Sequence, residues 1–261
     1  MVKVSVIMPC YNSSHYLREA IFSVVNQTYQ SWELLICDDT SQDNSPEIIR
    51  EFSEKYNNIY FVKNEFQKGA PGARNSCLKQ ARGKYIAFLD SDDLWLPTKL
   101  EDQIHFMEKN RISFCYTYNE VIDESGNYIT TYKAPSKVNA PRLKLMNYMS
   151  CLTVIYDSSK IGKVQQPNLK RRNDFALWLT ILNDTSCKEG FCYPHITAVY
   201  RQNSYGLSSN RLKALRDYME CQQKFNRMNL VSSYFWTSMY IIMSLLKRYF
   251  PVIYNYLVIK F

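Results

Sequence analysis

The sequence is poor in the residues that build flexible linkers, zinc sites and histidine-based catalytic centres. Its 261 residues include seven glycines and three histidines, and none of its eight cysteines forms a Cys-x-x-Cys pair. The low glycine count argues against a Gly-rich linker, and the cysteine spacing argues against a zinc site. We expect reduced, mostly buried thiols, as in a cytosolic protein.

Two common phosphate-binding signatures are also missing. The chain contains neither Gly-x-Gly-x-x-Gly nor a Walker A loop, so a nucleotide would have to be held in another way. We do not expect a secretory leader, because residues 2–7 have the pattern of a β-strand.

The positive charge is concentrated at the end of the chain. The net charge is +8, and residues 201–261 contain nine Lys and Arg but only two acidic residues. A basic segment indicates an anionic partner, which is either nucleic acid or an anionic membrane surface. No helix-turn-helix, zinc finger or other nucleic-acid-binding motif accompanies it, so we do not expect a nucleic-acid partner.

Strand-like and helix-like patterns alternate over the first 117 residues. The expected strands cover residues 4–8, 33–37, 59–62, 85–89 and 112–117, and the expected helices cover 17–25, 45–52, 72–81 and 97–110. This alternation predicts an α/β fold with a doubly wound, mostly parallel sheet. We expect Pro9 to end the first strand, Ser45 to cap the second helix and Gly83 to close the third. After residue 120 the alternation fades, and residues 123–127 are expected to form a hairpin turn.

Polar side chains follow three of the predicted strands. Tyr11 follows the first strand, Asp39 the second, and Asp90 and Asp92 the fourth. Ligands bind at the carboxyl ends of the strands in such sheets, so these residues are expected to form one site. Carboxylates at the end of a buried strand are costly to desolvate, and a divalent cation bridging a diphosphate would offset that cost. The Asp-x-Asp pattern therefore predicts a Mg²⁺ or Mn²⁺ site.

Both acidic motifs also have a simpler structural interpretation. Asp92 or Asp93 could cap the following helix at the end of a solvated turn. Asp174 precedes an apolar helical pattern and could be the N-cap of that helix.

Several motifs, taken in order, resemble the family 2 nucleotide-sugar glycosyltransferases of the GT-A fold. They are residues 4–12, 23–29, 38–39, 72–75, 83–93 and 95–97, so the resemblance covers about residues 1–115. Residues 172–178, 200–201 and 208–210 are similar to the teichuronic-acid and O-antigen branch, and they extend the resemblance to about residue 215.

The resemblance implies a donor site in the first half of the chain. Pro9 and Tyr11 would line the nucleobase pocket, with Tyr11 stacked on uracil or thymine. Asp39 would accept a hydrogen bond from the N–H of the base, and Arg74 would meet the ribose or the diphosphate.

The resemblance also implies the groups that carry out transfer. Asp90, Ser91 and Asp92 form the Asp-x-Asp motif, with Asp92 as the expected contact of Mn²⁺ or Mg²⁺. Asp174 matches the general base, although a Glu precedes this residue in many relatives and Asn173 precedes it here. The Gln-x-x-Arg-Trp motif of processive synthases is absent, which implies transfer of a single sugar.

The implied function is that of an inverting, non-processive, metal-dependent glycosyltransferase. It would move one sugar from a nucleotide-diphosphate sugar, expected to be a UDP-sugar, to a lipid-linked oligosaccharide acceptor in bacterial surface polysaccharide synthesis. We expect a GT-A catalytic domain over residues 1–200, with a nucleotide-sugar half (1–115) and an acceptor half (116–200). A helical segment would follow over residues 201–261.

Two other functions would leave different residues in place. A non-catalytic nucleotide-sugar-binding or scaffold protein would keep Tyr11 and Asp39 but could lose Asp92 or Asp174. Both acids are present, which favours an enzyme. A sugar-phosphate nucleotidyltransferase would need a Gly-rich N-terminal loop, which is missing here.

The end of the chain has the composition of a membrane-surface segment. Residues 229–246 are uncharged, a length that is borderline for a membrane span. Lys247 and Arg248 follow, and aromatic residues lie beyond them. We expect a monotopic segment that docks the enzyme on the anionic cytoplasmic face of the cell membrane. The alternative is a helical pair packed on the catalytic domain.

Overall fold

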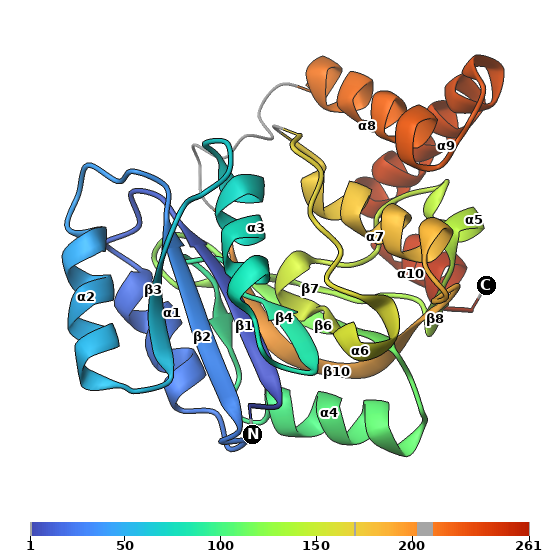
Figure 1. Cartoon of the computed structure of the whole chain (residues 1–261). Helices are drawn as coiled ribbons and strands as arrows, with labels where there is room; N and C mark the ends of the chain where they lie inside the picture. The colour runs from blue at the N-terminus through green and yellow to red at the C-terminus, as the bar shows by residue number, and fades with distance from the viewer. Residues whose placement is uncertain (1, 170, 203–210, 261) are drawn as a thin grey trace.

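One ten-stranded sheet runs through the computed structural model, which describes residues 2–169, 171–202 and 211–260 (Figure 1). The strands are β1 (Val4–Cys10), β2 (Trp32–Asp38), β3 (Ile59–Lys63), β4 (Tyr85–Phe88), β5 (Leu94–Trp95), β6 (Phe114–Ile122), β7 (Tyr128–Tyr132), β8 (Lys137–Val138), β9 (Ile155–Asp157) and β10 (Gly190–Arg201). The helices are α1 (Leu17–Val25), α2 (Ser45–Lys55), α3 (Ala70–Gln80), α4 (Lys99–Lys109), α5 (Ala140–Leu143), the 3-10 turn η1 (Cys151–Thr153), α6 (Ser158–Ile161), α7 (Asn173–Asp184), α8 (Arg211–Phe225), α9 (Leu230–Tyr249) and α10 (Pro251–Lys260).

The strand order in the sheet is β3-β2-β1-β4-β9-β6-β10-β5. Strands β1 to β4 are parallel, as the alternation of strands and helices predicts. β9 runs antiparallel to both β4 and β6, and β6 and β10 are again parallel to each other. β7 and β8 add antiparallel pairs to β6 and β10. The expected mostly parallel α/β sheet is confirmed.

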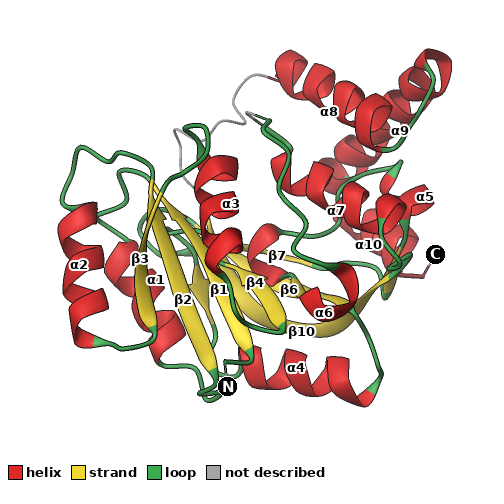
Figure 2. Ribbon diagram, in the orientation of Figure 1, coloured by secondary structure: helices red, strands yellow, loops and turns green. Residues whose placement is uncertain are grey.

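Apolar side chains cover both faces of this sheet. Helices α1, α2 and α4 contribute to one cluster, for example through Ile21, Ile49 and Ile104. Helices α3 and α7 contribute to the other, which includes Cys77 and Trp178. Figure 2 shows the helices on both sides of the yellow sheet. The central strands are therefore buried on both faces, which explains their continuous apolar runs.

The prediction that Pro9 ends the first strand is wrong. β1 continues through Pro9 to Cys10 and stays paired with β2 over that length. Its pairing with β4 ends at Ile7. Proline cannot donate a ladder hydrogen bond, but Pro9 lies beyond the last pair with β4, so no such bond is lost there.

Two expected helix caps are also wrong. The N-cap of α2 is Asn44, and Ser45 is the first residue of the helix. The C-cap of α3 is Ala81, so Gly83 lies outside the helix end. A Cβ atom at Gly83 would lie 2.5 Å from the backbone nitrogen of Ser5. Glycine is needed there for the close approach of two backbones rather than for a helix cap.

The second half of the sheet differs in length from the prediction but keeps the predicted turn. β6 begins at Phe114 and runs to Ile122, well beyond the expected end at residue 117. The hairpin turn between β6 and β7 is confirmed, since the Asp123 N–H donates to the Asn127 carbonyl at 2.9 Å.

Helices α8, α9 and α10 pack on the sheet domain through aromatic side chains. Tyr218 of α8 stacks on Phe175 of α7 with ring centroids 5.8 Å apart, and Tyr240 of α9 stacks on Tyr218 at 4.3 Å. Tyr254 of α10 is buried and donates to the sulfur of Met146 at 3.2 Å. Across the residues that the structure describes, no helix combines the length and apolar character needed to span a bilayer. Packing on the rest of the protein was the alternative to a membrane-surface segment. The buried side chains of these helices agree with that alternative.

Candidate active site

The carboxyl ends of β1, β2 and β4 meet at one edge of the sheet. β1 lies between β2 and β4 and is parallel to both. Just past the strand ends, the Asp39 N–H donates to the Cys10 carbonyl at 2.8 Å, and the Leu89 N–H donates to the Ile7 carbonyl at 3.1 Å. The structure therefore brings together the polar segments that follow the three strands, as expected from the sequence.

Tyr11 and Asp39, the two side chains expected to contact the donor base, both follow strands that end at this edge. The Tyr11 side chain is 50% exposed, and the Lys68 ammonium lies 5.1 Å from the centroid of its ring. Asp39 is buried, and its carboxylate accepts hydrogen bonds from Asn64 Nδ2 at 2.8 Å and from the Gly69 N–H at 2.6 Å. An exposed ring beside a carboxylate can stack on a base and accept a hydrogen bond from its N–H.

Two glycines allow the loop after β3 to approach Asp39. Gly69 has a φ of +121°, which side chains disfavour. A Cβ atom at Gly72 would lie 1.8 Å from the carbonyl oxygen of Gln67, so only glycine fits there. Pro9, the other residue expected in the base pocket, is buried within β1.

The loop after β1 is tied to the Asp-x-Asp segment through Ser91. The buried Ser91 hydroxyl donates to the Ser13 hydroxyl at 2.7 Å. Asn12 has a φ of +48°, and its side-chain oxygen accepts from the Gln42 N–H at 2.8 Å. These bonds fix the segments after β1, β2 and β4 relative to one another.

Arg74 of α3 is buried between the Asp-x-Asp segment and α7. Its guanidinium forms an ion pair with Asp90, donates to Gln166 Oε1 at 3.0 Å, and donates to Asn173 Oδ1 at 3.4 Å. Burial is the largest single effect and opposes the charge of Arg74, but Asp90, Cys151 and Asp174 together outweigh it, so the pKa of the guanidinium is raised. Arg74 thus links Asp90 to the residue preceding Asp174.

Asp93 is hydrogen-bonded to the end of β10, the last strand along the chain. Its buried carboxylate accepts from the Arg201 N–H at 2.9 Å, while Arg201 Nε donates to the Asp92 carbonyl at 3.1 Å and Arg201 pairs with Glu19 at 2.9 Å. Burial, and then repulsion from Asp92 and Asp90, raises the pKa of Asp93 well above its usual range. The alternative in which Asp92 or Asp93 caps the next helix is wrong, because α4 starts later, with Thr98 as its N-cap.

Asp90 and Asp92 suit a divalent cation that is shared with a diphosphate. Both side chains are partly exposed at the edge of the sheet. Within the described ranges, no group of three or more His, Cys, Asp or Glu side chains is arranged to enclose a metal ion. Mg²⁺ usually takes one or two carboxylates and completes its shell with substrate phosphates and water, so two acids suffice. A cation here would also offset the repulsion that raises the pKa of Asp93.

Asp174 is the second residue of α7, and the alternative that makes it the N-cap is wrong. The N-cap is Arg172, which has a φ of +59°. Asp174 Oδ2 accepts a hydrogen bond from Asn147 Nδ2 at 3.1 Å. Burial raises the pKa of the Asp174 carboxyl, whereas the nearby Arg172 and Arg74 act in the opposite direction. A carboxylate with a raised pKa is suited to accept a proton near neutral pH.

Two side chains that orient these groups could not be found from the sequence. Gln166 lies in a loop and exchanges two bonds with Asn75 of α3, through its N–H at 2.7 Å and its carbonyl at 2.9 Å. Asn147 Oδ1 accepts from the Met149 N–H at 3.1 Å, which turns the Asn147 amide nitrogen toward Asp174. Neither residue belongs to a strand-end motif, so no local pattern marked them. Residues 208–210, which also carried the resemblance, lie outside the described residues.

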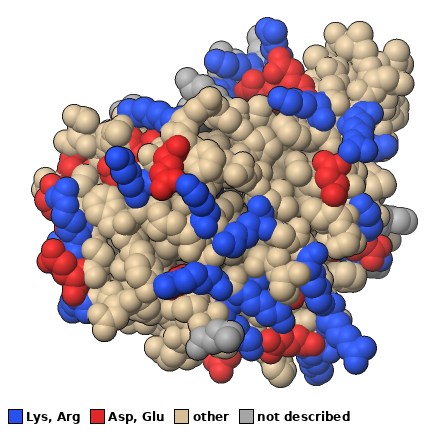
Figure 3. All heavy atoms as spheres, in the orientation of Figure 1, with Lys and Arg blue, Asp and Glu red and all other residues tan. Residues whose placement is uncertain are grey.

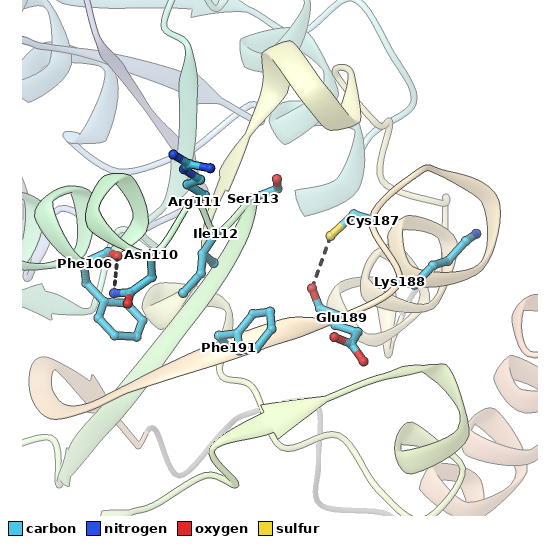
Figure 4. A pocket seen from close by; sticks show the side chains of 9 residues that line it. All are labelled: Phe106, Asn110, Arg111, Ile112, Ser113, Cys187, Lys188, Glu189 and Phe191. Carbon is cyan, nitrogen blue, oxygen red and sulfur yellow. Dashed lines mark hydrogen bonds between the residues drawn. The ribbon is translucent and has the colours of Figure 1, made fainter.

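A cavity lies at the opposite edge of the sheet. It has a volume of about 530 Å³ and lies between the end of α4 and the starts of β6 and β10 (Figure 4). Phe106, Ile112 and Phe191 form its apolar wall. None of the expected site residues lines it, and the carboxyl edge remains the candidate site.

Comparison with known proteins places this geometry in context. A family model described as glycosyl transferase family 2 matches residues 5–164. WfgD of Escherichia coli, named as a UDP-Glc:alpha-D-GlcNAc-diphosphoundecaprenol beta-1,3-glucosyltransferase, is 39% identical over 247 residues, which cover 95% of this chain and 95% of WfgD. TuaG of Bacillus subtilis, whose name assigns it to teichuronic acid biosynthesis as a glycosyltransferase, is 33% identical over 234 residues, covering 88% of this chain and 91% of TuaG.

A solved structure shares the same fold. S. aureus TarS 1-349 in complex with UDP-GlcNAc aligns with a TM-score of 0.69 at 20% sequence identity, covering 92% of this chain and 72% of that one. These findings confirm the resemblance inferred from the motifs and the GT-A fold expected with it.

Proposed function

Because the chain belongs to glycosyl transferase family 2 and is a glycosyltransferase, we propose that it transfers glucose from UDP-glucose to a lipid-linked diphosphate sugar. WfgD, which is similar over 95% of both chains, is named for this donor and for a diphosphoundecaprenol acceptor. We propose that transfer is non-processive, inverts the anomeric carbon and depends on a divalent metal ion.

The donor would lie along the edge formed by β1, β2 and β4. Tyr11 would stack on the uracil ring, and Asp39 would accept the base N–H in addition to the bonds from Asn64 and Gly69. Arg74 is buried next to Asp90 and is proposed to meet the diphosphate from the side of α3. Asp90 and Asp92 would hold Mn²⁺ or Mg²⁺. A bound cation would supply positive charge for the leaving diphosphate.

Asp174 is proposed to be the general base. Its carboxylate would take the proton of the acceptor hydroxyl while that oxygen attacks the anomeric carbon. The bond to the diphosphate oxygen would break on the opposite side of the sugar ring, and the electron pair would leave with UDP. A single displacement of this kind inverts the anomeric centre. The Asn147 amide would hold the base in place through its bond to Asp174 Oδ2.

The acceptor is proposed to reach the enzyme at the membrane surface. Many of the exposed large apolar side chains lie on α9 and α10, including Val231 at 80% exposure, Phe235 at 59% and Val252 at 81%. In Figure 3, Lys and Arg side chains lie across the centre and lower right, whereas the protruding part at the upper right, over α9, is formed by other residues. We infer a peripheral enzyme that rests its α9–α10 side on an anionic cytoplasmic leaflet.

The single observation that supports an enzyme most strongly is the placement of Asp174. Asp174 is the second residue of α7, and its Oδ2 accepts from Asn147 Nδ2 at 3.1 Å. The preceding Asn173 accepts from Arg74, which pairs with Asp90. A non-catalytic scaffold would need neither the acid nor its neighbours.

The test is transfer by the purified protein. UDP-glucose, MnCl₂ and a short-chain GlcNAc-diphosphate lipid should yield a product heavier by one hexose, with a β-anomeric proton coupling in the NMR spectrum. UDP-galactose and UDP-GlcNAc serve as competing donors, and EDTA should stop the reaction. Binding of UDP-glucose without any product would favour the scaffold alternative.

A further inference from the structure

Tyr200 extends the candidate active site toward the acceptor half of the sheet. It is the penultimate residue of β10, next to Arg201, and 40% of its side chain is exposed. Burial raises the pKa of its phenol, and the acids Asp93, Asp92 and Asp90 act in the same direction. An exposed ring close to the acids can stack against a sugar that enters the site.

A second tyrosine, Tyr132, lies on the other side of β6 from Tyr200. It is the last residue of β7 and pairs with Asn119 of β6, while Tyr200 pairs with Val121 on the other side of β6. Tyr132 also acts electrostatically on Tyr200. Tyr132 and Tyr200 thus lie on the two strands that flank β6, with Tyr200 near the acids and Tyr132 next to Lys247 of α9.

Lys247 of α9 lies over the ring of Tyr132. Its ammonium lies 3.7 Å from the centroid of the Tyr132 ring and 5.8 Å from that of Tyr254. No carboxylate is paired with Lys247 among the residues that the structure describes. Burial lowers the pKa of Lys247 to about 8. A partly buried cation that has ring faces but no carboxylate beside it in the described part of the chain would be stabilised by an anion.

The position of Lys247 suits an anion that is attached to a lipid. Lys247 lies in the last turn of α9, and its neighbours Leu245 and Tyr249 are exposed. Exposed Val252 and Ile253 follow at the start of α10. Apolar surface thus adjoins the cation, and Tyr132 beneath it lies within electrostatic reach of Tyr200, which is near the acids.

We propose that Lys247, held over Tyr132, binds the diphosphate of the lipid-linked acceptor, and that Tyr132 and Tyr200 line the path of its sugar. The lipid chain would lie against the apolar surface of α9 and α10, with the diphosphate on Lys247. The sugar would extend past Tyr200 toward Asp174. The assignment rests on the proposed function, since it concerns the acceptor of the same reaction.

A soluble prenyl diphosphate tests the subsite without catalysis. Geranyl diphosphate should bind the full-length protein in calorimetry, and Lys247→Met should weaken that binding roughly ten- to a hundred-fold, because charged hydrogen bonds contribute about 1.5–3 kcal/mol. Lys247→Arg should retain most of it. Lys224→Met is the matched control, because the Lys224 ammonium lies 5.5 Å from the Phe225 ring, on α8. Equal binding by the wild type and Lys247→Met would overturn the assignment.

Kinetics separate the diphosphate from other anions. With a short-chain GlcNAc-diphosphate lipid in detergent, Lys247→Met should raise the acceptor KM by a similar factor and leave the UDP-glucose KM unchanged. With a GlcNAc glycoside that lacks the diphosphate, the variant and the wild type should be equal. A loss confined to binding of anionic vesicles would assign Lys247 to lipid headgroups instead. If the wild type transfers no sugar, the proposed function fails, while the geranyl diphosphate result still decides the subsite.

Discussion

Arg74, buried on α3, forms an ion pair with Asp90 at the end of β4, so one acid of the Asp-x-Asp pair already has a positive partner within the protein. Asp90 also lies within electrostatic reach of Asp174. Arg74 therefore adjoins both the expected metal-binding motif and the expected base. We therefore expect the two acids to differ in role, with Asp92 as the main contact of the metal ion and Asp90 as the partner of Arg74.

Replacing Arg74 should affect both stability and the pH profile. Arg74→Ala leaves the partly exposed Asp90 without its partner, and losing a hydrogen bond to a charged group costs about 1.5–3 kcal/mol. Because Arg74 also lowers the pKa of Asp174, its loss should move the rise of kcat to higher pH. Thermal melting and a kcat–pH profile measure the two effects. A profile identical to that of the wild type would remove Arg74 from the surroundings of the base.

Replacing Asp92 should abolish metal-dependent donor binding. Asp92→Ala removes the expected contact of the cation while the Arg74–Asp90 pair keeps the edge of the sheet intact. We expect no transfer, and no stabilisation by UDP with Mn²⁺ in a melting assay, at a Tm close to that of the wild type. Full activity of the variant in EDTA would contradict this assignment.

Asp174→Asn should lower kcat with little change in nucleotide affinity. Loss of a general base costs roughly 10²–10⁴-fold in rate. In the wild type, kcat should fall as the pH drops through the raised pKa of Asp174, because only the ionised carboxylate accepts a proton. Steady-state kinetics between about pH 4 and about pH 9 measure both effects. Asp184→Asn, at the other end of α7, is the matched control.

The pH dependence of folding should carry a contribution from Lys99. This lysine is fully buried on α4, where its ammonium bonds to Gln103 and lies 5.1 Å from the Trp95 ring. Burial lowers its pKa to about 7 in the folded state, whereas the unfolded chain keeps a value near 10.5. Between these values the unfolded state binds more protons, so the free energy of unfolding should rise as pH increases from about 7 to about 10.

Lys99→Met isolates that contribution. The variant should lose the part of the slope between neutral and alkaline pH that belongs to Lys99, as measured by urea unfolding at several pH values. Lys109→Met, at the other end of α4, is the control. An unchanged slope in Lys99→Met would mean that the buried amine keeps its proton.

The exposed side of α9 should govern attachment to vesicles. The double substitution Val231→Glu and Phe235→Glu places charge at two exposed apolar positions and should weaken binding to anionic liposomes about ten-fold or more. Phe61→Glu, at an exposed apolar position on β3, should have no effect. Sedimentation with vesicles at low and high salt provides the measurement. Wild-type protein that stays in the supernatant at low salt would exclude this surface as the docking side.

The sequence was sufficient for the parts of the fold that repeat a local pattern. The first four strands, their helices and the strand-end acids follow from apolar periodicity and from the rule that parallel strands present their carboxyl ends together. It was insufficient where a residue depends on a distant partner. The use of Asp93 to bind Arg201, 108 positions away, has no local signature, and neither does the bond from Asn147 to Asp174. The helix-cap prediction for Gly83 failed for a related reason. The glycine is required there by the close approach of the Ser5 backbone, which is distant in sequence.

Pro9 has a consequence for the shape of the substrate edge. Backbone groups of residues 7 and 9 face the same neighbouring strand, and the Ile7 carbonyl already accepts from Leu89. A residue with an N–H at position 9 could donate one more hydrogen bond to β4. The pairing of the two strands would then extend toward the acids. Proline has no backbone N–H and cannot donate that bond. The end of the pairing between β1 and β4 at Ile7 is thus set by covalent chemistry rather than by a bulky side chain, because position 9 has no N–H in any conformation.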